Sequence, residues 1–496
     1  MENTGIKTRT ILAATLACAA AFAPVVAQAQ DSMPPLVKQM YDGTWPDKTA
    51  DQQLIQERLY QRGIEAYMLT LPILNTIGMR DGSEGKFGKG YNVLPVWKDR
   101  MNAKTWVPTP NCDVIYSMSY LDLKATGPLV VYAPPNVIGM FTDFWQKTIT
   151  DVGAIGPDRA RGGLYLLLPP DYEGQVPSGY FAFKSSTYNV FLFFRTVLKQ
   201  GENGSDVRDA VALAETTRVY PLEALDRERK PMQFPNASNI RVNMMYPTDF
   251  SYWEKLKAFV DYERVAAITP EVRGVLASIG IVKGLPFTPN AAEKAALTKA
   301  VETAPKMIFA WRLAGRADHK ELYYTDRQYF NAWAGVDAEW FRPSYLDVDQ
   351  RDSFFQVAYS SSPGMVMGSI NQGSKYPSTM RDKDGDLLDG SKFYKLHLPP
   401  GIPAKLYWAV TIYNPADGTM PETDQPFPSR NTFDRVQNAD GSIDLYFGPT
   451  KPEGVNEKNW IQTLKGRAFL VTIRLYGSGT EFYDQTWKPD DVVKMK

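Results

Sequence analysis

Histidine and cysteine are both scarce in this chain, which has two of each in 496 residues. The histidines are His319 and His397, and the cysteines are Cys18 and Cys112. A Ser-His-Asp triad or a histidine-rich zinc site needs a well-placed imidazole. His319 lies in a polar stretch and is expected to be solvated, and His397 is expected to be an ordinary strand histidine. The sequence also lacks a Gly-x-Ser-x-Gly nucleophile elbow. These absences argue against a serine hydrolase and a zinc enzyme.

The chain has no excess of either charge, because 55 lysines and arginines are matched by 55 aspartates and glutamates. It also has no run rich in lysine and arginine that could contact a phosphate backbone. We therefore expect no nucleic-acid partner. With 44% hydrophobic and 12% aromatic residues, the chain has enough apolar side chains to bury packed cores.

The N-terminus has the pattern of an export signal. Lys7 and Arg9 precede an uncharged apolar stretch at residues 11–27, and an Ala-Gln-Ala sequence at 27–29 supplies the small-x-small pattern of a cleavage site. Residues 1–29 are thus predicted to be a cleaved signal peptide of a periplasmic or secreted protein. A membrane anchor is the alternative, but Pro24 interrupts the stretch, and no later run is long enough to span a membrane. Lipidation at Cys18 is another alternative.

Residues 30–90 are expected to form an N-terminal helical segment followed by a loop. Apolar residues recur every three or four positions between residues 51 and 77, which predicts a helix that is broken at Pro72. Gly82, Gly85, Gly88 and Gly90 then predict a mobile surface loop, since the sequence lacks the lysine and hydroxyl residue of a phosphate-binding loop.

The rest of the chain divides into two regions of strands with helices between them. Runs of β-branched and aromatic residues at 114–123, 127–133, 163–168 and 190–197 predict an N-terminal β domain over residues 91–230, which also contains a helical pattern at 206–220. Residues 231–350 are predicted to form a helical insert, with Asn290 and Glu293 as a capping box. Strand patterns at 392–398, 405–413, 443–447 and 468–475 indicate a C-terminal β-sandwich domain over 351–496. The predicted class is α+β, with two antiparallel sandwich-like or barrel-like domains.

With imidazole and thiol nearly absent, carboxylates, tyrosines and arginines are the groups left for catalysis. The densest set contains Asn111, Asp113 and Tyr116, with Arg159 further along the chain. A buried carboxylate near an arginine can act as a general base, so we assign Asp113 as base, Tyr116 as acid, and Asn111 or Arg159 as the group that orients a substrate. The alternative is that Asn111 and Asp113 form an Asx-type turn that begins a strand.

Aromatic residues supply the candidates for ligand binding. Rigid aromatic rings can line an apolar or sugar-binding cleft at little entropic cost. The aromatic candidates are Trp145, Tyr165, Trp408 and Trp460, and the alternative for each ring is a place in a sheet core. The carboxylate of Asp143, two residues before Trp145, is the one polar candidate.

No cofactor is predicted, with calcium as the one weak possibility. Asp382, Asp384 and Asp386 have the alternating spacing of a calcium loop. However, Leu387 stands where that loop requires glycine, and Phe393 stands where it requires glutamate. A plain Asp-Gly turn is the favoured interpretation.

Several of these motifs together resemble a known family. The first part of the chain resembles the first of two adjacent bacterial domains of unknown function, numbered 1254 and 1214. The resemblance lies in residues 109–117, followed by Leu121-Asp122-Leu123, Gly127-Pro128 and residues 163–166. The second domain is resembled by the C-terminal part of the chain, in residues 384–394 and 407–413, Asp440-Gly441-Ser442, Asn459-Trp460 and Arg474-Leu475-Tyr476. Many members carry Arg where this chain has Cys112 and Thr where it has Val114. The resemblance implies an exported protein with two β domains and implies no reaction.

These observations lead to three hypotheses about function. The first is an enzyme, a hydrolase or lyase that uses carboxylate and tyrosine groups on a small molecule at the junction of the two β domains. The second is a non-catalytic envelope or ligand-binding module for a carbohydrate or an apolar metabolite. The third is a structural homo-oligomer.

Overall fold

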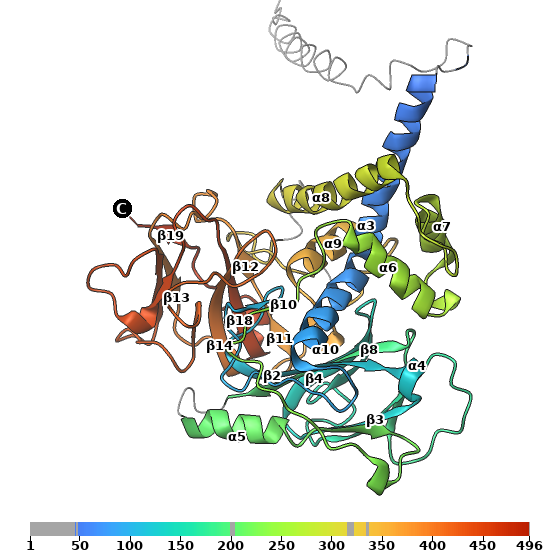
Figure 1. The fold of residues 1–496 in the computed structure, drawn as a ribbon. Coiled ribbons are helices and arrows are strands. Elements are labelled where there is room, and N and C mark those ends of the chain that lie inside the picture. Colours follow the sequence, from blue (N-terminus) through green and yellow to red (C-terminus); the bar gives the residue numbers. More distant parts are fainter. Residues whose placement is uncertain (1–44, 46–47, 199–203, 315–321, 334–336, 496) are drawn as a thin grey trace, which may run out of the picture.

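Two β-sandwiches and a group of helices make up the computed structural model (Figure 1). The structure describes residue 45 and residues 48–198, 204–314, 322–333 and 337–495. The predicted signal peptide and His319 lie outside these described residues. None of the helices in the described ranges is both long and apolar enough to cross a membrane.

The N-terminal sandwich consists of two four-stranded sheets. The first has the order β2-β8-β4-β5, with β2 Val114–Asp122, β8 Asn189–Val197, β4 Val137–Asp143 and β5 Thr148–Val152, all antiparallel. The second has the order β7-β6-β3-β9, with β7 Phe181–Lys184, β6 Gly163–Leu168, β3 Leu129–Ala133 and β9 Arg218–Pro221. Alternate side chains of both sheets, such as Leu192 and Phe194 of β8 and Leu167 of β6, form the core between them.

The C-terminal sandwich has the same two-layer construction. One sheet has the order β11-β18-β14-β15, with β11 Ser374–Lys375, β18 Leu470–Ser478, β14 Ala404–Tyr413 and β15 Ser429–Asn431, and β12 Ser378–Thr379 also pairs with β18. The other has the order β17-β16-β13-β19, with β17 Trp460–Gln462, β16 Ile443–Gly448, β13 Tyr394–Leu398 and β19 Val493–Lys494. Their shared core contains Val410, Ile473 and Leu445.

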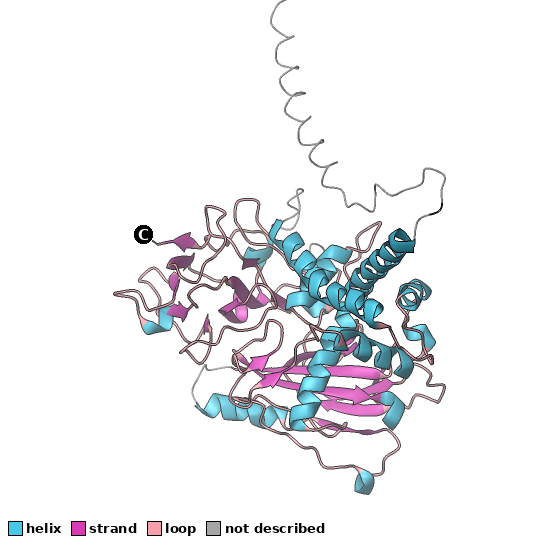
Figure 2. Cartoon of the chain, turned by 45° about the horizontal axis from the view of Figure 1, so that its top comes forward, coloured by secondary structure: helices cyan, strands magenta, loops and turns pink. Residues whose placement is uncertain are grey.

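The helices cover the outer face of the first N-terminal sheet, as Figure 2 shows. The long helix α3 Lys48–Phe87 contacts most of the other large helices, namely α6 Ser251–Tyr262, α7 Pro270–Ser278, α8 Ala291–Ala314 and α9 Val348–Val357. The shorter helices are α4 Leu123–Thr126, α5 Gly204–Ala214, α10 Pro363–Val366 and α11 Thr480–Tyr483, with 3-10 turns at Asp226–Glu228, Val265–Ala267 and Glu457–Asn459. A two-stranded parallel pair joins β1 Thr105–Trp106 to β10 Val242–Asn243.

The predicted break at Pro72 is wrong, because α3 continues through it. Proline lacks an N–H and therefore leaves the carbonyl of Met68, four residues earlier, without its helical donor. Arg351 of α9 places its Nη2 3.4 Å from that carbonyl. Tertiary packing thus compensates for the lost bond and allows the helix to continue.

The predicted glycine loop is also partly wrong, since Gly82 and Gly85 belong to α3. A Cβ on Gly82 would lie 2.0 Å from the carbonyl oxygen of Asn243, so the backbones approach too closely for a larger residue. Only Gly88 and Gly90, with φ of 103° and 138°, lie in the loop. Gly82 therefore serves helix packing at one end of this segment, and Gly88 and Gly90 serve the turn at the other.

The remaining predictions mostly agree with the structure. The capping box before α8 is confirmed. Asn290 Oδ1 accepts hydrogen bonds from the N–H groups of Ala292 and Glu293, and Glu293 Oε2 accepts one from the N–H of Asn290. The α+β class is confirmed, and the described strands form open sandwiches with no closed barrel among them. The predicted helix at 206–220 is too long, since it ends at Ala214 and residues 218–221 form strand β9, paired with β3. Three short pairs, β1–β10, β6–β7 and β16–β17, are parallel.

Candidate functional site

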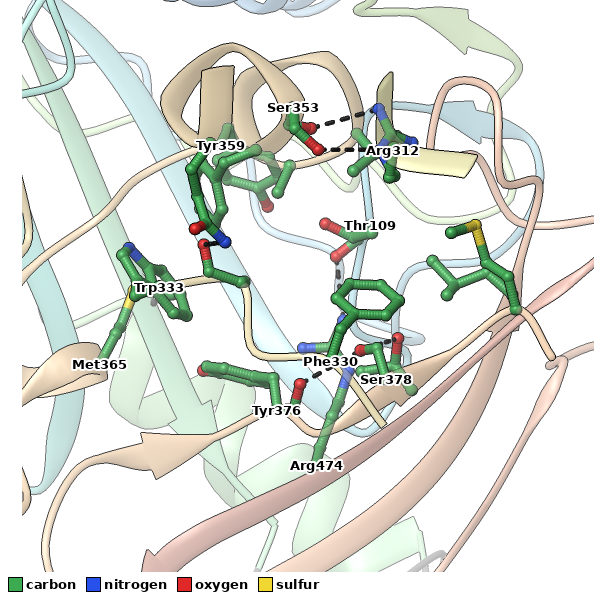
Figure 3. Close-up of a pocket in the computed structure, with 18 of the residues that line it drawn as sticks. Thr109, Arg312, Phe330, Trp333, Ser353, Tyr359, Met365, Tyr376, Ser378 and Arg474 are labelled. Carbon is green, nitrogen blue, oxygen red and sulfur yellow. Dashed lines mark hydrogen bonds between the residues drawn. The ribbon is translucent and has the colours of Figure 1, made fainter. Parts of the chain in front are cut away.

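A cavity of about 470 Å³ lies where the two sandwiches and the helices meet. Its wall combines β2 and β8 of the N-terminal domain, the ends of α8 and α9, residues 322–333, and β12 and β18 of the C-terminal domain. Figure 3 shows side chains from all around this space, with Arg312 and Arg474 drawn on opposite sides of it. The volume falls in the range of small-molecule sites.

Strand alternation explains why particular side chains reach the cavity. In β8, Val190, Leu192 and Phe194 face the sandwich core, so Phe191, Phe193 and Arg195 face the helices and the junction. In β18, Val471, Ile473 and Leu475 face the other core, so Thr472, Arg474 and Tyr476 face the junction. The two sheets thereby present one arginine each to the same space.

The charge on the cavity wall is one-sided. Four of the described residues that line it are arginines and none is an aspartate or glutamate. Two of the four are bonded to the protein: Arg312 donates to Ser353 Oγ at 3.0 Å and to the carbonyl of Pro415 at 2.7 Å, and Arg381 donates to the carbonyls of Gly385 and Leu313, each at 2.8 Å. Most of the remaining wall is apolar or aromatic, including Phe193, Phe330, Trp333, Phe354, Met365 and Met380.

The other two arginines, Arg195 and Arg474, are buried and less completely bonded. They are 3% and 6% exposed, and the Nε–H of each has no hydrogen-bond partner among the described residues. Arg474 Nη2 donates to the carbonyl of Thr109 at 3.0 Å and to the phenol of Tyr413. The phenols around both groups raise their pKa above the ordinary arginine value, although burial alone would lower it. Both therefore stay charged inside the protein.

Tyrosines surround the two guanidinium groups. Tyr116 and Tyr376 line the cavity, and Tyr476 stacks on Tyr407 with ring centroids 4.2 Å apart. Burial alone would raise the pKa of Tyr476, but Arg474 and Arg195 outweigh this and lower it to about 8. Burial raises the pKa of Tyr116 well above its ordinary value, with Arg195 opposing the shift. The site therefore contains one phenol that ionises near neutral pH beside others that stay protonated.

Three of the four predicted catalytic residues lie together beside this cluster. Asn111 donates through Nδ2 to the phenols of Tyr407 and Tyr476, at 2.9 and 2.8 Å, and its backbone N–H lies 3.2 Å from the phenol of Tyr116. Its Oδ1 accepts from the N–H of Asp113 at 2.6 Å, which is the Asx-type turn considered as the alternative. Tyr116 lines the cavity, whereas Asn111 and Asp113 stand behind the wall.

Asp113 connects the two β domains. Its Oδ2 accepts from Ser429 Oγ at 2.9 Å and its Oδ1 from Asn431 Nδ2 at 2.7 Å, both on β15. Its carboxylate is 4% exposed. The neighbouring Cys112 is also buried, and burial raises the pKa of its thiol.

Arg159 is not brought to this cluster. It is exposed, adopts a φ of 49° in the loop after β5, and is absent from the cavity wall. Asp143 is buried at the end of β4, where it accepts from Ser186 and the N–H of Lys147, and burial raises its pKa to about 6. Neither residue shares a site with Tyr116 in the structure.

The predicted ligand-binding aromatics have partners elsewhere in the protein. Trp145 donates to the carbonyl of Ala267 at 2.7 Å, and the phenol of Tyr165 donates to Asp158 at 2.7 Å inside the N-terminal core. Trp408 belongs to the C-terminal core, and Trp460 donates to the carbonyl of Gly448 at 3.0 Å. The cavity is lined by other rings, including Trp311, Trp333 and Tyr359.

The calcium candidates form a tight turn. Asp382 Oδ1 accepts from the N–H groups of Asp384 and Asp386, at 3.1 and 3.0 Å, and Gly385 has a φ of 87°. Across the described ranges, no group of three or more metal-binding side chains is found. His397 lies on β13 with its Nδ1 2.7 Å from Asp444 Oδ1, as an ordinary strand histidine would.

Sequence reasoning missed Arg195 and Arg474 as a pair, although each carries a local signal. Arg195 interrupts the apolar run of residues 190–198, and Arg474 interrupts that of residues 468–475. A single charge inside an otherwise apolar strand is costly unless something at that position needs it. That signal marks both residues separately, but it does not show that they meet.

Comparison with known proteins places the two β domains in described families. Residues 91–221 match the family model "Protein of unknown function (DUF1254)", and residues 373–480 match "Protein of unknown function (DUF1214)". The chain therefore matches two domains of unknown function that follow one another, which confirms the resemblance seen in the sequence. No curated protein matches the chain significantly.

Two solved structures are similar to this chain to different degrees. The crystal structure of the VPA0106 protein from Vibrio parahaemolyticus is similar over 88% of this chain and 100% of its own, with a TM-score of 0.52 and 18% identity. An uncharacterized protein from Burkholderia cenocepacia matches over 90% of this chain and 96% of its own, with a TM-score of 0.38 and 13% identity. The first of these shows a common fold at low sequence identity.

Proposed function

We propose that this protein binds a small organic molecule in the cavity at the junction of its two β domains. The observation that carries the proposal is the cavity itself, about 470 Å³ in volume and lined by aromatic and aliphatic side chains with a few polar groups. Such a lining removes the apolar part of a ligand from water, while the polar groups fix its orientation.

A neutral fluorescent probe tests this proposal. We expect N-phenyl-naphthylamine, which brightens in apolar surroundings, to bind the full chain with a micromolar dissociation constant. Ala332→Phe fills the cavity wall and should weaken that binding at least about tenfold, because the added ring takes ligand space. Ala295→Phe, on the exposed face of α8, is the matched control and should bind as the unaltered protein does. A probe that does not bind, or binds equally to both variants, would contradict the proposal.

A second candidate function is catalysis by the tyrosines. It is favoured by one specific observation, the lowered pKa of Tyr476, which makes this phenol a possible proton acceptor near pH 8. Tyr116 lines the cavity and stays protonated, so it would donate a proton to a bound molecule. Tyr476 bonds to Tyr376, which also lines the cavity, so a proton from that molecule would pass to the phenol oxygen of Tyr376 while Tyr376 gives its own proton to Tyr476. Under this candidate the protein is the hydrolase or lyase expected from its residues.

Recovery of bound compounds separates the two candidates. Compounds that displace the probe are incubated with the protein and then analysed by mass spectrometry. Conversion that disappears in Tyr116→Phe and slows in Tyr476→Phe, with the binding of the probe unchanged, would establish catalysis. Recovery of every bound compound without change would leave the protein as a binding module.

Export from the cytoplasm is proposed together with binding. The support is the sequence pattern of residues 1–29, which ends in Ala-Gln-Ala. N-terminal sequencing of the protein from a cell-envelope fraction should begin at Gln30. A chain that keeps residues 1–29 and stays in the cytoplasm would contradict this proposal.

A further inference from the structure

We infer that the ligand of the junction cavity is an organic acid, whose carboxylate binds between Arg195 and Arg474 while its apolar body lies against the aromatic wall. This inference rests on the proposed function, because it names the chemical class of the molecule that the cavity binds. Nothing in the matching families assigns a ligand.

The first argument is the energetic state of the two arginines. Both guanidinium groups line the cavity, are at least nine-tenths buried, and keep an Nε–H that has no hydrogen-bond partner in the part of the chain that the structure describes. A buried, charged donor that is left without a partner is destabilising, and proteins rarely retain one without a use for it. The strongest charge interactions of both groups are with phenols, not with carboxylates. An anionic ligand would supply the missing acceptor and the missing negative charge.

The second argument is the contrast with Arg312 and Arg381, which line the same cavity. Arg312 donates hydrogen bonds to Ser353 Oγ and the carbonyl of Pro415, and Arg381 donates to the carbonyls of Gly385 and Leu313. Charge alone therefore does not identify the anion site. The end of the cavity at Arg195 and Arg474 is distinguished because unused donors are present there.

The third argument concerns the type of anion. A carboxylate is planar and singly charged, so it can accept parallel hydrogen bonds from a guanidinium group. A phosphate monoester carries more charge, and removing it from water into this aromatic surrounding costs more. Phenols at the same end, such as Tyr376, can donate to the carboxylate, and Trp333, Phe354 and Met365 provide the surface for an apolar chain or ring.

Competition against N-phenyl-naphthylamine tests the inference. Three compounds with the same body are compared: phenylbutyrate, its neutral amide phenylbutanamide, and phenylbutyl phosphate. We expect phenylbutyrate to displace the probe at a concentration at least about tenfold lower than either of the others. In Arg195→Met and in Arg474→Met, this preference for the acid should fall to about threefold or less.

Two further variants serve as controls. Arg430→Met removes a buried guanidinium group that does not line the cavity, so it should keep the full preference for the acid. Arg195→Lys keeps the positive charge and should keep part of the preference for the acid. For every variant, binding of the probe reports that the protein is folded.

The possible results distinguish this inference from the proposed function. If the acid and the amide compete equally, if neither displaces the bound probe, or if the arginine variants keep the preference, the inference is wrong while the small-molecule site stands. A phosphate that competes better than the acid would also overturn it. If the probe does not bind to the unaltered protein, the proposed function fails and the inference fails with it.

Discussion

Asp113 and Arg195 are two buried charges at the same domain junction, and they differ in how completely the protein satisfies their hydrogen bonds. Both oxygens of Asp113 accept hydrogen bonds, from Ser429 and Asn431 of the opposite domain. The Nε–H of Arg195 has no partner within the described ranges, and its guanidinium group lines a cavity. A charge whose bonds are complete stabilises the interface, whereas a charge with unused donors is available to a ligand.

The difference follows from the position of each group relative to the cavity. Asp113 lies in the segment of residues 109–113, which packs directly on the C-terminal sheet, where Thr109 N donates to the carbonyl of Gly418 at 2.7 Å. Arg195 lies on β8, where the two domains are separated by the cavity. The comparison predicts that removal of each charge changes stability in opposite directions.

The largest expected effect is that of Asp113→Ala. This change removes the acceptor of two buried donors, Ser429 and Asn431, so the free energy of unfolding should fall by about 3 kcal/mol. Denaturation in urea, followed by tryptophan fluorescence, measures the shift of the midpoint. Asp113→Asn keeps the shape and one acceptor oxygen, and it should lose less. An unchanged midpoint in Asp113→Ala would show that the carboxylate does not hold the domains together.

A smaller effect of opposite sign is expected for Arg195→Met. Without a ligand, methionine fills a similar volume and removes a charge that the protein does not fully bond, so the free energy of unfolding should rise by about 1 kcal/mol. The same urea titration measures it, with Asp113→Ala as the reference. A loss as large as that of Asp113→Ala would mean that the comparison between the two charges is wrong.

The smallest effect concerns pH. Below pH 8 the Tyr476 phenol is neutral, and above it the phenolate places a negative charge beside Arg474 and Arg195, with Tyr407 and Tyr376 as its nearest phenols. Binding of phenylbutyrate, which stays ionised throughout, should therefore weaken about threefold between pH of about 7 and about 9. Probe displacement at both pH values measures this change. Tyr476→Phe should bind equally at both, and a pH dependence that persists in it would assign the effect to another group.

Much of the fold was predictable because local patterns are physical constraints on short segments. The apolar run of residues 163–168, with its aromatic Tyr165, predicted β6 with the bounds that the structure has, and the capping box at Asn290 predicted the start of α8. The turn at Asn111 was also a local inference, since an Asx side chain bonds to the backbone two residues later. The same reasoning brought Asn111, Asp113 and Tyr116 together, because they are neighbours in the chain.

What the sequence by itself determined is therefore the face on which each side chain lies, including the arginines on the outer faces of β8 and β18. Only the tertiary structure decided what covers those faces. Arg351 of α9 reaches the carbonyl that Pro72 leaves without its helical donor. Arg195 and Arg474 come from different domains to line one cavity, and the proposed anion site rests on that arrangement. Periodicity reports local direction, whereas a contact between distant segments depends on how whole sheets and helices pack, which no short pattern encodes.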